Sequence, residues 1–184
     1  MKRTVKSLAL VAVGAMLVSV LVWAADNPLK NAKVGEWIEF VIHTQTMGQT
    51  MDTKMKQTVI AKDAVSVTLR NVTTVMGKEM SNDTKIMFDQ PYEPYKMPNS
   101  DAVVTPLGEG NETITVGGKP YNCHWVKVKV VTTKPQAMEG TTKVWSCKDV
   151  PVNNMVKMET ESAMKMGDKV MNTTMTMELV GSGK

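Results

Sequence analysis

Residues 155–180 read MVKMETESAMKMGDKVMNTTMTMELV, and this stretch decides the predicted fold. Polar and apolar residues alternate on both sides of Gly167-Asp168, which is the period of a half-buried β-strand. Gly at the first of two loop residues suits a type II′ turn, because that position needs a positive φ. The stretch therefore predicts an antiparallel hairpin. Its predicted cross-strand pairs are Val156 with Leu179, Met158 with Met177, Thr160 with Met175, Met164 with Met171 and, on the opposite face, Lys157 with Glu178.

The same Met-Gly signal occurs twice more, at Met47-Gly48 and Met76-Gly77. With Gly48-Gln49 and Gly77-Lys78 as the loop residues, apolar residues again lie opposite apolar residues, which a one-residue slip would destroy. The predicted pairs are Ile38 with Val59, Ile42 with Met55, Val67 with Phe88, Leu69 with Ile86 and Val75 with Met80. Three Met-Gly hairpins thus predict a sheet of consecutive antiparallel strands.

Cys123 and Cys147 are the only cysteines in the chain. In an oxidising compartment the default expectation is one disulfide, which would close a loop of about 25 residues. A pair of metal-binding thiolates is the weaker alternative, because the two residues lack a Cys-x-x-Cys spacing. Placing them opposite each other aligns Trp125 with Trp145 in a further hairpin. The same register also sets Lys127 against Lys143, which counts against it.

The first 24 residues resemble a secretory signal peptide. Lys2, Arg3 and Lys6 precede an apolar run from Leu8 to Val22, which is shorter than the roughly 20 residues of a spanning helix. An uncleaved anchor is the lesser alternative. Residues 25–184 then form one soluble domain, periplasmic or secreted, without a stable membrane span. Removing three of the 22 basic residues leaves 19 against 18 acidic ones, so the near-neutral domain argues against nucleic-acid binding.

Residues 90–111 differ from the rest of the chain. Four prolines and two tyrosines, Tyr92 and Tyr95, occur among them, and no alternation is visible. Long loops of this kind often cover a binding site, although a plain connection across one end of a sheet is an equally good interpretation. No apolar stripe with a period of 3.6 residues follows the leader, so the sequence predicts no substantial helix.

Methionine is the most unusual part of the composition: 17 residues, of which only Met1 and Met16 lie in the leader. Many of them fall on inward strand faces. They could simply fill a core, or line a deformable apolar cavity beneath residues 90–111. They could also bind Cu(I), for which Met164-x-Met166 and Met175-x-Met177 are the closest spacings. The candidate ligand-binding residues are Met51, Met55, Met80, Tyr92, Tyr95, Met158, Met164, Met175 and Met177.

Signals of catalysis are missing from the sequence. It contains no Gly-x-Ser-x-Gly elbow, no His-Glu-x-x-His and no phosphate-binding glycine loop. His43 and His124 are the only histidines, and Ser146 has no identifiable base. We therefore expect a protein that is not an enzyme and that has no resident cofactor or metal.

With these strands in place, the chain after the leader resembles exported bacterial proteins of the lipoprotein-carrier type in its architecture. The segment from Trp145 to Pro151, followed by Val156 to Glu159, also resembles exported bacterial proteins of this general shape. The resemblance implies an open antiparallel half-barrel that holds acyl chains. The carriers also have helices closing the concave side and a gating arginine in an early strand, and Arg70 is the only arginine after the leader. No site residue is carried over from them.

Together these features predict an all-β fold. We expect about nine or ten antiparallel strands in a strongly curved half-barrel or open barrel, with a β-sandwich as the alternative. The predicted function is binding of an apolar ligand such as a lipid. Periplasmic Cu(I) binding and a structural role in the cell envelope are the alternatives.

Overall fold

The structure is a computed structural model that describes residues 27–96, 100–134, 137–166 and 169–184, with the side chain of Met166 left out. The predicted leader, residues 1–24, and the Gly167-Asp168 turn lie outside these residues. The elements are η1 (Pro28–Asn31), β1 (Trp37–Thr46), β2 (Gln49–Lys62), β3 (Ser66–Val75), β4 (Lys78–Met87), β5 (Val103–Val116), β6 (Lys119–Thr132), β7 (Met138–Ser146), β8 (Met155–Met166) and β9 (Lys169–Gly183). Within the described ranges, no helix is long and apolar enough to cross a membrane.

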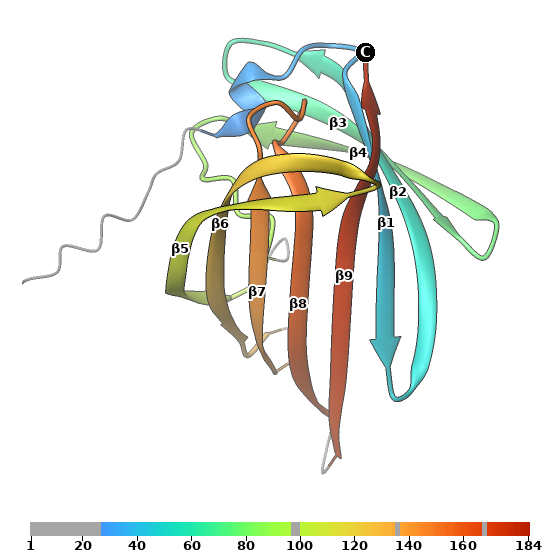
Figure 1. Ribbon diagram of the computed structural model, residues 1–184, viewed down its shortest axis with the longest axis vertical. Coiled ribbons are helices and arrows are strands. Elements are labelled where there is room, and N and C mark those ends of the chain that lie inside the picture. The colour runs from blue at the N-terminus through green and yellow to red at the C-terminus, as the bar shows by residue number, and fades with distance from the viewer. Residues whose placement is uncertain (1–26, 97–99, 135–136, 167–168) are drawn as a thin grey trace, which may run out of the picture.

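The described strands form one nine-stranded antiparallel sheet in the order β4-β3-β2-β1-β9-β8-β7-β6-β5. The sheet is strongly curved and does not close (Figure 1). The two edge strands, β4 and β5, follow each other in the chain, so the connection between them runs from one edge of the sheet to the other. The predicted all-β half-barrel is therefore confirmed.

The register of the C-terminal hairpin is confirmed, and so is that of the cysteine-bearing strands. Met158 pairs with Met177 and Lys157 with Glu178, and the Lys157 ammonium lies 2.9 Å from the Glu178 carboxylate. The β6–β7 pairing sets Trp125 opposite Trp145, as predicted. The Lys127–Lys143 pairing is also present, and the position of the Lys143 ammonium, described below, accounts for it.

The predicted turns of the first two hairpins were wrong by one residue. The loop residues are Met47-Gly48 and Met76-Gly77, all four with positive φ as in a type I′ turn. Phe40 therefore faces Met55, and Val67 faces Ile86. The partners shift by two residues, so the inward faces stay the same. The observed registers set His43 against Asp52 and Arg70 against Asp83. The predicted registers would have set His43 against Lys54 and Arg70 against Lys85.

The predicted loop at 90–111 is shorter in the structure, because β5 begins at Val103. The edge position of β5 tolerates Pro106, which has no backbone donor, and the register shifts between Pro106 and Gly108. A Cβ atom on Gly110 would lie 3.1 Å from the Trp125 ring, so this glycine lets the indole pack against the strand. The prolines and glycines from residue 103 onward thus belong to an edge strand, although the sequence predicted a loop there.

The hydrophobic core occupies one end of the inner, concave face. Phe40 and Ile38 are fully buried at the centre of the sheet. Leu29 of η1 belongs to the same buried cluster and is also fully buried. Asn27 caps η1, since its Oδ1 accepts from the Leu29 amide at 3.1 Å. We call this filled part the closed half of the inner face.

Candidate functional site

The other end of the inner face is lined by threonine and methionine rather than by core residues. Alternation along the strands places these side chains on the same face as Phe40, in three cross-strand rows. Most are half-buried, whereas Thr142 is buried. We call these residues the open half of the inner face. Its rows are Thr142, Thr160, Met175 and Thr44; Gly140, Ser162, Thr173 and Thr46; and Met138, Met164 and Met171.

Threonine hydroxyls in the open half are satisfied by one another. The Oγ1 atoms of Thr142 and Thr160 lie 3.0 Å apart, and so do those of Thr46 and Thr173. Each bond joins two hydroxyls across neighbouring strands, one donating its proton and the other accepting it. These positions are therefore left with methyl groups for further contact, beside the thioethers of the methionines. The open half is consequently more apolar than its composition suggests.

Gly140, in the middle row, allows β7 and β8 to approach each other closely. A Cβ atom there would lie 2.6 Å from the Glu161 carbonyl oxygen and 2.9 Å from the Ser162 Cβ. No real Cβ fits at such distances, so β7 and β8 approach each other closely at this point.

The predicted ligand-binding residues divide into three groups. Met158 and Met177 are buried in the core, and Met55, Tyr92 and Tyr95 pack against it. Met164 and Met175 lie in the open half of the inner face. Met51 and Met80 are exposed at the ends of the β1–β2 and β3–β4 hairpins. Only Met164 and Met175 are thus brought together on a surface that a ligand could contact.

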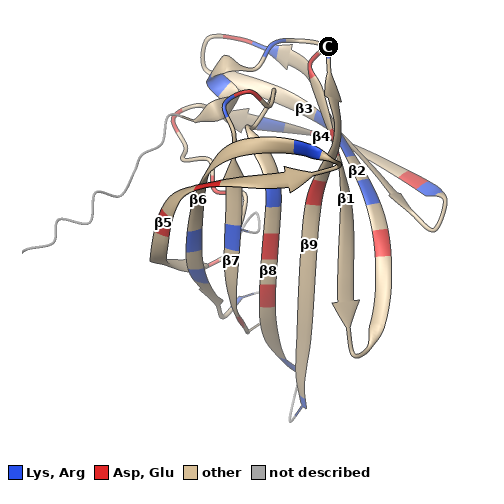
Figure 2. Cartoon of the chain, in the orientation of Figure 1, with Lys and Arg blue, Asp and Glu red and all other residues tan. Residues whose placement is uncertain are grey.

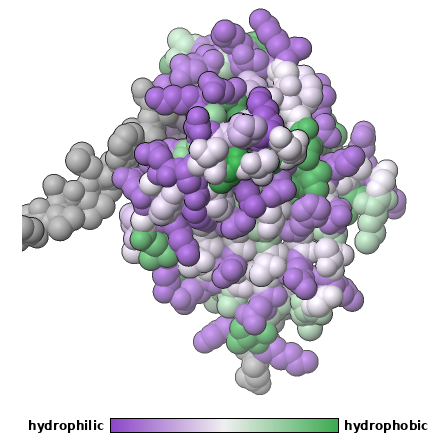
Figure 3. All heavy atoms as spheres, in the orientation of Figure 1, coloured by the Kyte–Doolittle hydropathy of each residue, from purple (hydrophilic) through white to green (hydrophobic). Residues whose placement is uncertain are grey.

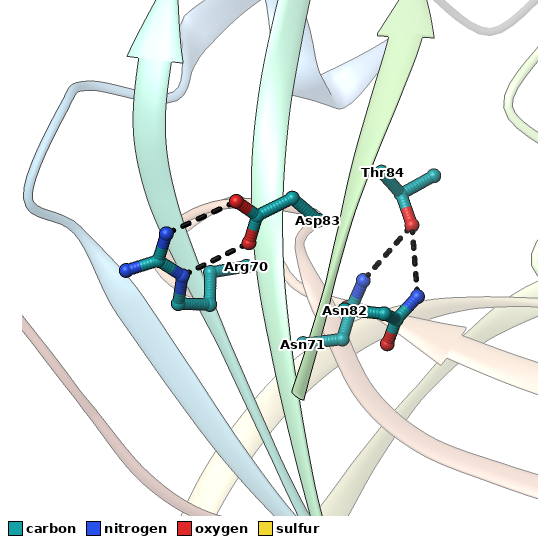
Figure 4. A network of polar contacts seen from close by, with 5 residues as sticks. All are labelled: Arg70, Asn71, Asn82, Asp83 and Thr84. Atoms are coloured by element: carbon teal, nitrogen blue, oxygen red, sulfur yellow. Dashed lines mark hydrogen bonds and ion pairs between the residues drawn. The ribbon is translucent and has the colours of Figure 1, made fainter. Parts of the chain in front are cut away.

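A polar network crosses the closed half and was not expected from the sequence. Gln57 and Asn71 are bonded at 2.9 Å, and the Asn71 amide donates to Thr84 Oγ1 at 3.2 Å (Figure 4). Asn153, on the turn before β8, donates to Gln57 Oε1 at 3.1 Å. Burial raises the pKa of Tyr92 to about 12, although a hydrogen bond with Asn153 acts in the opposite direction. Tyr92 is therefore a neutral phenol fixed to the core.

Arg70 points to the outer face and not into the concavity. Its Nε and Nη2 atoms bond the two Asp83 carboxylate oxygens at 2.9 and 3.0 Å (Figure 4). The guanidinium hydrogen bonds keep the pKa of the Asp83 carboxyl below its usual value. Arg70 consequently does not occupy the place of the gating arginine that the carrier resemblance implies.

An aromatic cluster lies on the outer face, where the far half of the β5–β6 hairpin crosses β7 and β8 (Figure 1). The Lys143 ammonium is 4.3 Å from the ring centroids of both Trp125 and Trp145. It also lies 2.7 Å from Glu112 Oε1, which accepts a hydrogen bond from Trp145 Nε1. Figure 2 shows basic and acidic residues in a band across β7, β8 and β9. In this position the Lys143 ammonium is bound by Glu112 and the two indole rings, which offsets its repulsion by Lys127 on the neighbouring strand.

Two pockets lie on the described part of the sheet. One, of about 550 Å³, is lined by both cysteines together with Glu112, His124 and Asp149. The other, of about 780 Å³, lies on β6–β9; its lining includes outer-face residues such as Val131 and Val170 and also Met138, Gly140, Ser162 and Thr173 of the open half. Within the described residues, no group of three or more His, Cys, Asp or Glu side chains is placed to hold a metal ion.

Comparison with known proteins gives only remote similarities. No family model matches the chain, and no curated protein matches it. One similar solved structure, provisionally described as an exported protein with a YmcC-like fold, comes from Bacteroides fragilis; it is 12% identical, with a TM-score of 0.46 over 83% of this chain and 97% of that one. Another, provisionally described as a lipoprotein, comes from Parabacteroides distasonis; it is 13% identical, with a TM-score of 0.42 over 81% and 96%. Similarities this low transfer neither a ligand nor an activity.

Met138 and Met171 belong to the open half but were not among the predicted ligand-binding residues. The hairpin register had already set Met171 opposite Met164, so the signal for Met171 was present in the sequence. Met138 had no predicted strand or cross-strand partner. β7 in fact begins at Met138, which pairs with Met164.

Proposed function

We propose that this chain is an exported, non-catalytic protein that binds an apolar ligand, such as the acyl chain of a lipid, on the open half of the inner face. One observation carries the proposal: this surface pairs four of its six hydroxyls with one another and leaves methyls and thioethers half-exposed. The free energy of binding an apolar molecule to such a surface is favourable, because apolar groups are removed from water and few polar groups lose their hydration.

Methionine suits this role for a physical reason. Its side chain is unbranched and can repack around a flexible chain without demanding one shape. The closed half, by contrast, is filled by Phe40, Ile38 and Leu29, so it would limit how far a ligand can extend along the inner face. Each methylene group removed from water would contribute roughly 0.8 kcal/mol before the costs of ordering.

A charge placed in the open half should abolish this binding. Met171→Lys is expected to weaken the binding of a fluorescent palmitic acid analogue by at least about tenfold, because the ammonium would meet methylene groups without a partner. Gln45→Lys is the matched control, since Gln45 is exposed on the outer face between Thr44 and Thr46 and lines neither of the two pockets. Fluorescence titration measures both. Equal affinity in the two variants, or no binding by the unaltered protein, would refute the proposal.

Cu(I) binding is the second candidate, and one observation favours it. Met138, Met164 and Met171 are direct cross-strand neighbours on three adjacent strands. Neighbouring Cβ atoms on one face are roughly 5 Å apart, which lets three thioethers converge on one soft ion. Native mass spectrometry of protein purified from its own cells separates the candidates, because a bound lipid and a bound copper ion differ in mass.

We also propose that Cys123 and Cys147 form a disulfide after export. In the structure both cysteines are free thiols. They are buried, line one pocket and lie just beyond the last ladder pair, His124 with Ser146. Burial and the neighbouring Cys147 raise the pKa of Cys123 to about 11, so the folded thiol is a poor nucleophile. Oxidation would therefore occur before the surrounding strands are complete.

Reduction of this bond should lower the free energy of unfolding by roughly 3 kcal/mol, the loop-entropy value for a loop of this length. Urea denaturation with and without a reductant measures the difference, and Cys123→Ser/Cys147→Ser serves as the control that no longer responds to reductant. Two thiols that react fully with a thiol reagent in unfolded, unreduced protein from the periplasm would show that the bond is absent.

A further inference from the structure

Two hairpin turns present the same short motif, Met-Gly-x-x-Met, at residues 47–51 and 76–80. In both, the turn methionine points into solvent: Met47 is 79% exposed and Met76 is 89% exposed. The last methionines of the two motifs, Met51 and Met80, are 42% and 60% exposed. Neither hairpin therefore uses the thioethers at its turn for packing.

The two turn methionines also have an unfavourable backbone conformation. Met47 has φ of 52° and Met76 has φ of 49°, in the left-handed region that Asn, Asp and Gly tolerate best. A residue with a long side chain costs about 1 kcal/mol or more there. The stability of the hairpins thus gives no reason for methionine at either position.

The three hairpins point their turns to the same end of the sheet. β1, β3 and β8 run in the same direction, since each is separated from the next by antiparallel neighbours. The β8–β9 hairpin adds Val170, which is 60% exposed. Figure 3 shows hydrophobic residues at this lower end and at the right-hand edge, where these turns lie in Figure 1. We define the rim as Met47, Met51, Met76, Met80 and Val170.

Basic residues flank the rim. Lys165 pairs with Val170, Lys169 begins β9, and Lys78 follows the Met76 turn; all three lysines are exposed. On the acidic side, Asp52 is bonded to His43 at 2.7 Å, while Glu79 adjoins Lys78. The lysines can contact phosphate groups while the thioethers enter the apolar layer beneath them.

We propose that the rim is a docking surface for an anionic phospholipid bilayer. The turns project separately, and a fluid bilayer accepts separate apolar projections, whereas a rigid partner would need a matching hollow for each. Lysine ammonium groups among the projections complement the negative phosphates. The inference goes beyond ligand binding. Met51 pairs with Thr44 and so borders the open half, but Met47 and Met76, which the test replaces, lie in the turns outside it.

Replacing both turn methionines by asparagine tests the docking surface and separates it from stability. Asparagine favours a type I′ turn, so Met47→Asn/Met76→Asn should keep or raise the melting temperature. The fraction that cosediments with vesicles of equal parts phosphatidylcholine and phosphatidylglycerol should nevertheless fall at least about tenfold in partition coefficient. Binding of the palmitic acid analogue should stay unchanged, which distinguishes failure of the rim from failure of the ligand site.

The matched control replaces exposed valines at the opposite end of the sheet. Val34 and Val65 are 54% and 57% exposed, so Val34→Asn/Val65→Asn removes a comparable apolar surface. This control should bind vesicles like the unaltered protein. Equal vesicle binding by all three proteins would overturn the proposal, and so would an equal loss in both double variants. Concentration-dependent dimerisation that only Met47→Asn/Met76→Asn abolishes, without vesicle binding, would instead identify the rim as a contact between two copies.

Discussion

Phe40→Ala is expected to lower the free energy of unfolding by about 3–5 kcal/mol, the usual range for a fully buried phenylalanine. Phe40 is 0% exposed on β1, and its cross-strand neighbours are Met55 and Leu179. β1 joins the β2–β4 side of the sheet to β9, so neither side can collapse into the gap without moving the other. Removing the ring therefore leaves most of its volume empty.

Urea denaturation followed by tryptophan fluorescence measures this loss. Phe40→Leu is the matched control: it keeps a large apolar side chain and should cost less than half as much as alanine. The unfolding midpoint of Phe40→Ala is expected to fall while the m value stays constant. A loss of less than about 1 kcal/mol would mean that Phe40 is not a core residue.

The two correctly predicted registers had long-range markers in the sequence. The C-terminal hairpin pairs Lys157 with Glu178 on one face and methionines on the other, so only one alignment satisfies both faces. The cysteine pair fixed the β6–β7 alignment in the same way. In the first two hairpins the apolar pattern is unchanged by a shift of two residues. Only the charged pairs, such as Arg70 with Asp83, distinguish the alternatives, and they had not been used.

Much of the candidate site could not be predicted, because its character depends on where the core ends. Met158 and Met164 lie on the same face of β8, six residues apart, yet only Met158 is buried by the core. Met158 belongs to the buried cluster together with Val144 and Met155, whereas Met164 does not. Nothing in the methionine pattern indicates where along β8 this cluster ends. The bond between Thr142 and Thr160 likewise required the pairing of β7 with β8, which the sequence had left undefined.

Trp145→Ala is expected to cost about 3–5 kcal/mol and to release the far half of the β5–β6 hairpin from the outer face. The indole is 5% exposed, and its Nε1 donates to Glu112 on β5. Its ring also holds the Lys143 ammonium, at 4.3 Å from the centroid. One truncation thus removes apolar burial, a hydrogen bond to a carboxylate and a cation–π contact. At urea concentrations too low for global unfolding, the β5 amides should exchange hydrogen faster in Trp145→Ala than in the unaltered protein.

Two single substitutions divide this effect. Trp145→Phe keeps a ring but removes the Nε1 donor, and it should cost about 1–2 kcal/mol. Because hydrogen bonds from Lys143 and Trp145 lower the pKa of Glu112 from 4.5, stability from these bonds is present above that pH and is lost as the pH falls through the lowered value. The difference in unfolding free energy between the unaltered protein and Trp145→Phe should therefore shrink on acidification.

Lys143→Met should lower the free energy of unfolding by at most about 1 kcal/mol, since it also removes the like charge opposite Lys127. A larger loss from Lys143→Met than from Trp145→Ala would mean that the ammonium, not the indole, holds the hairpin in place.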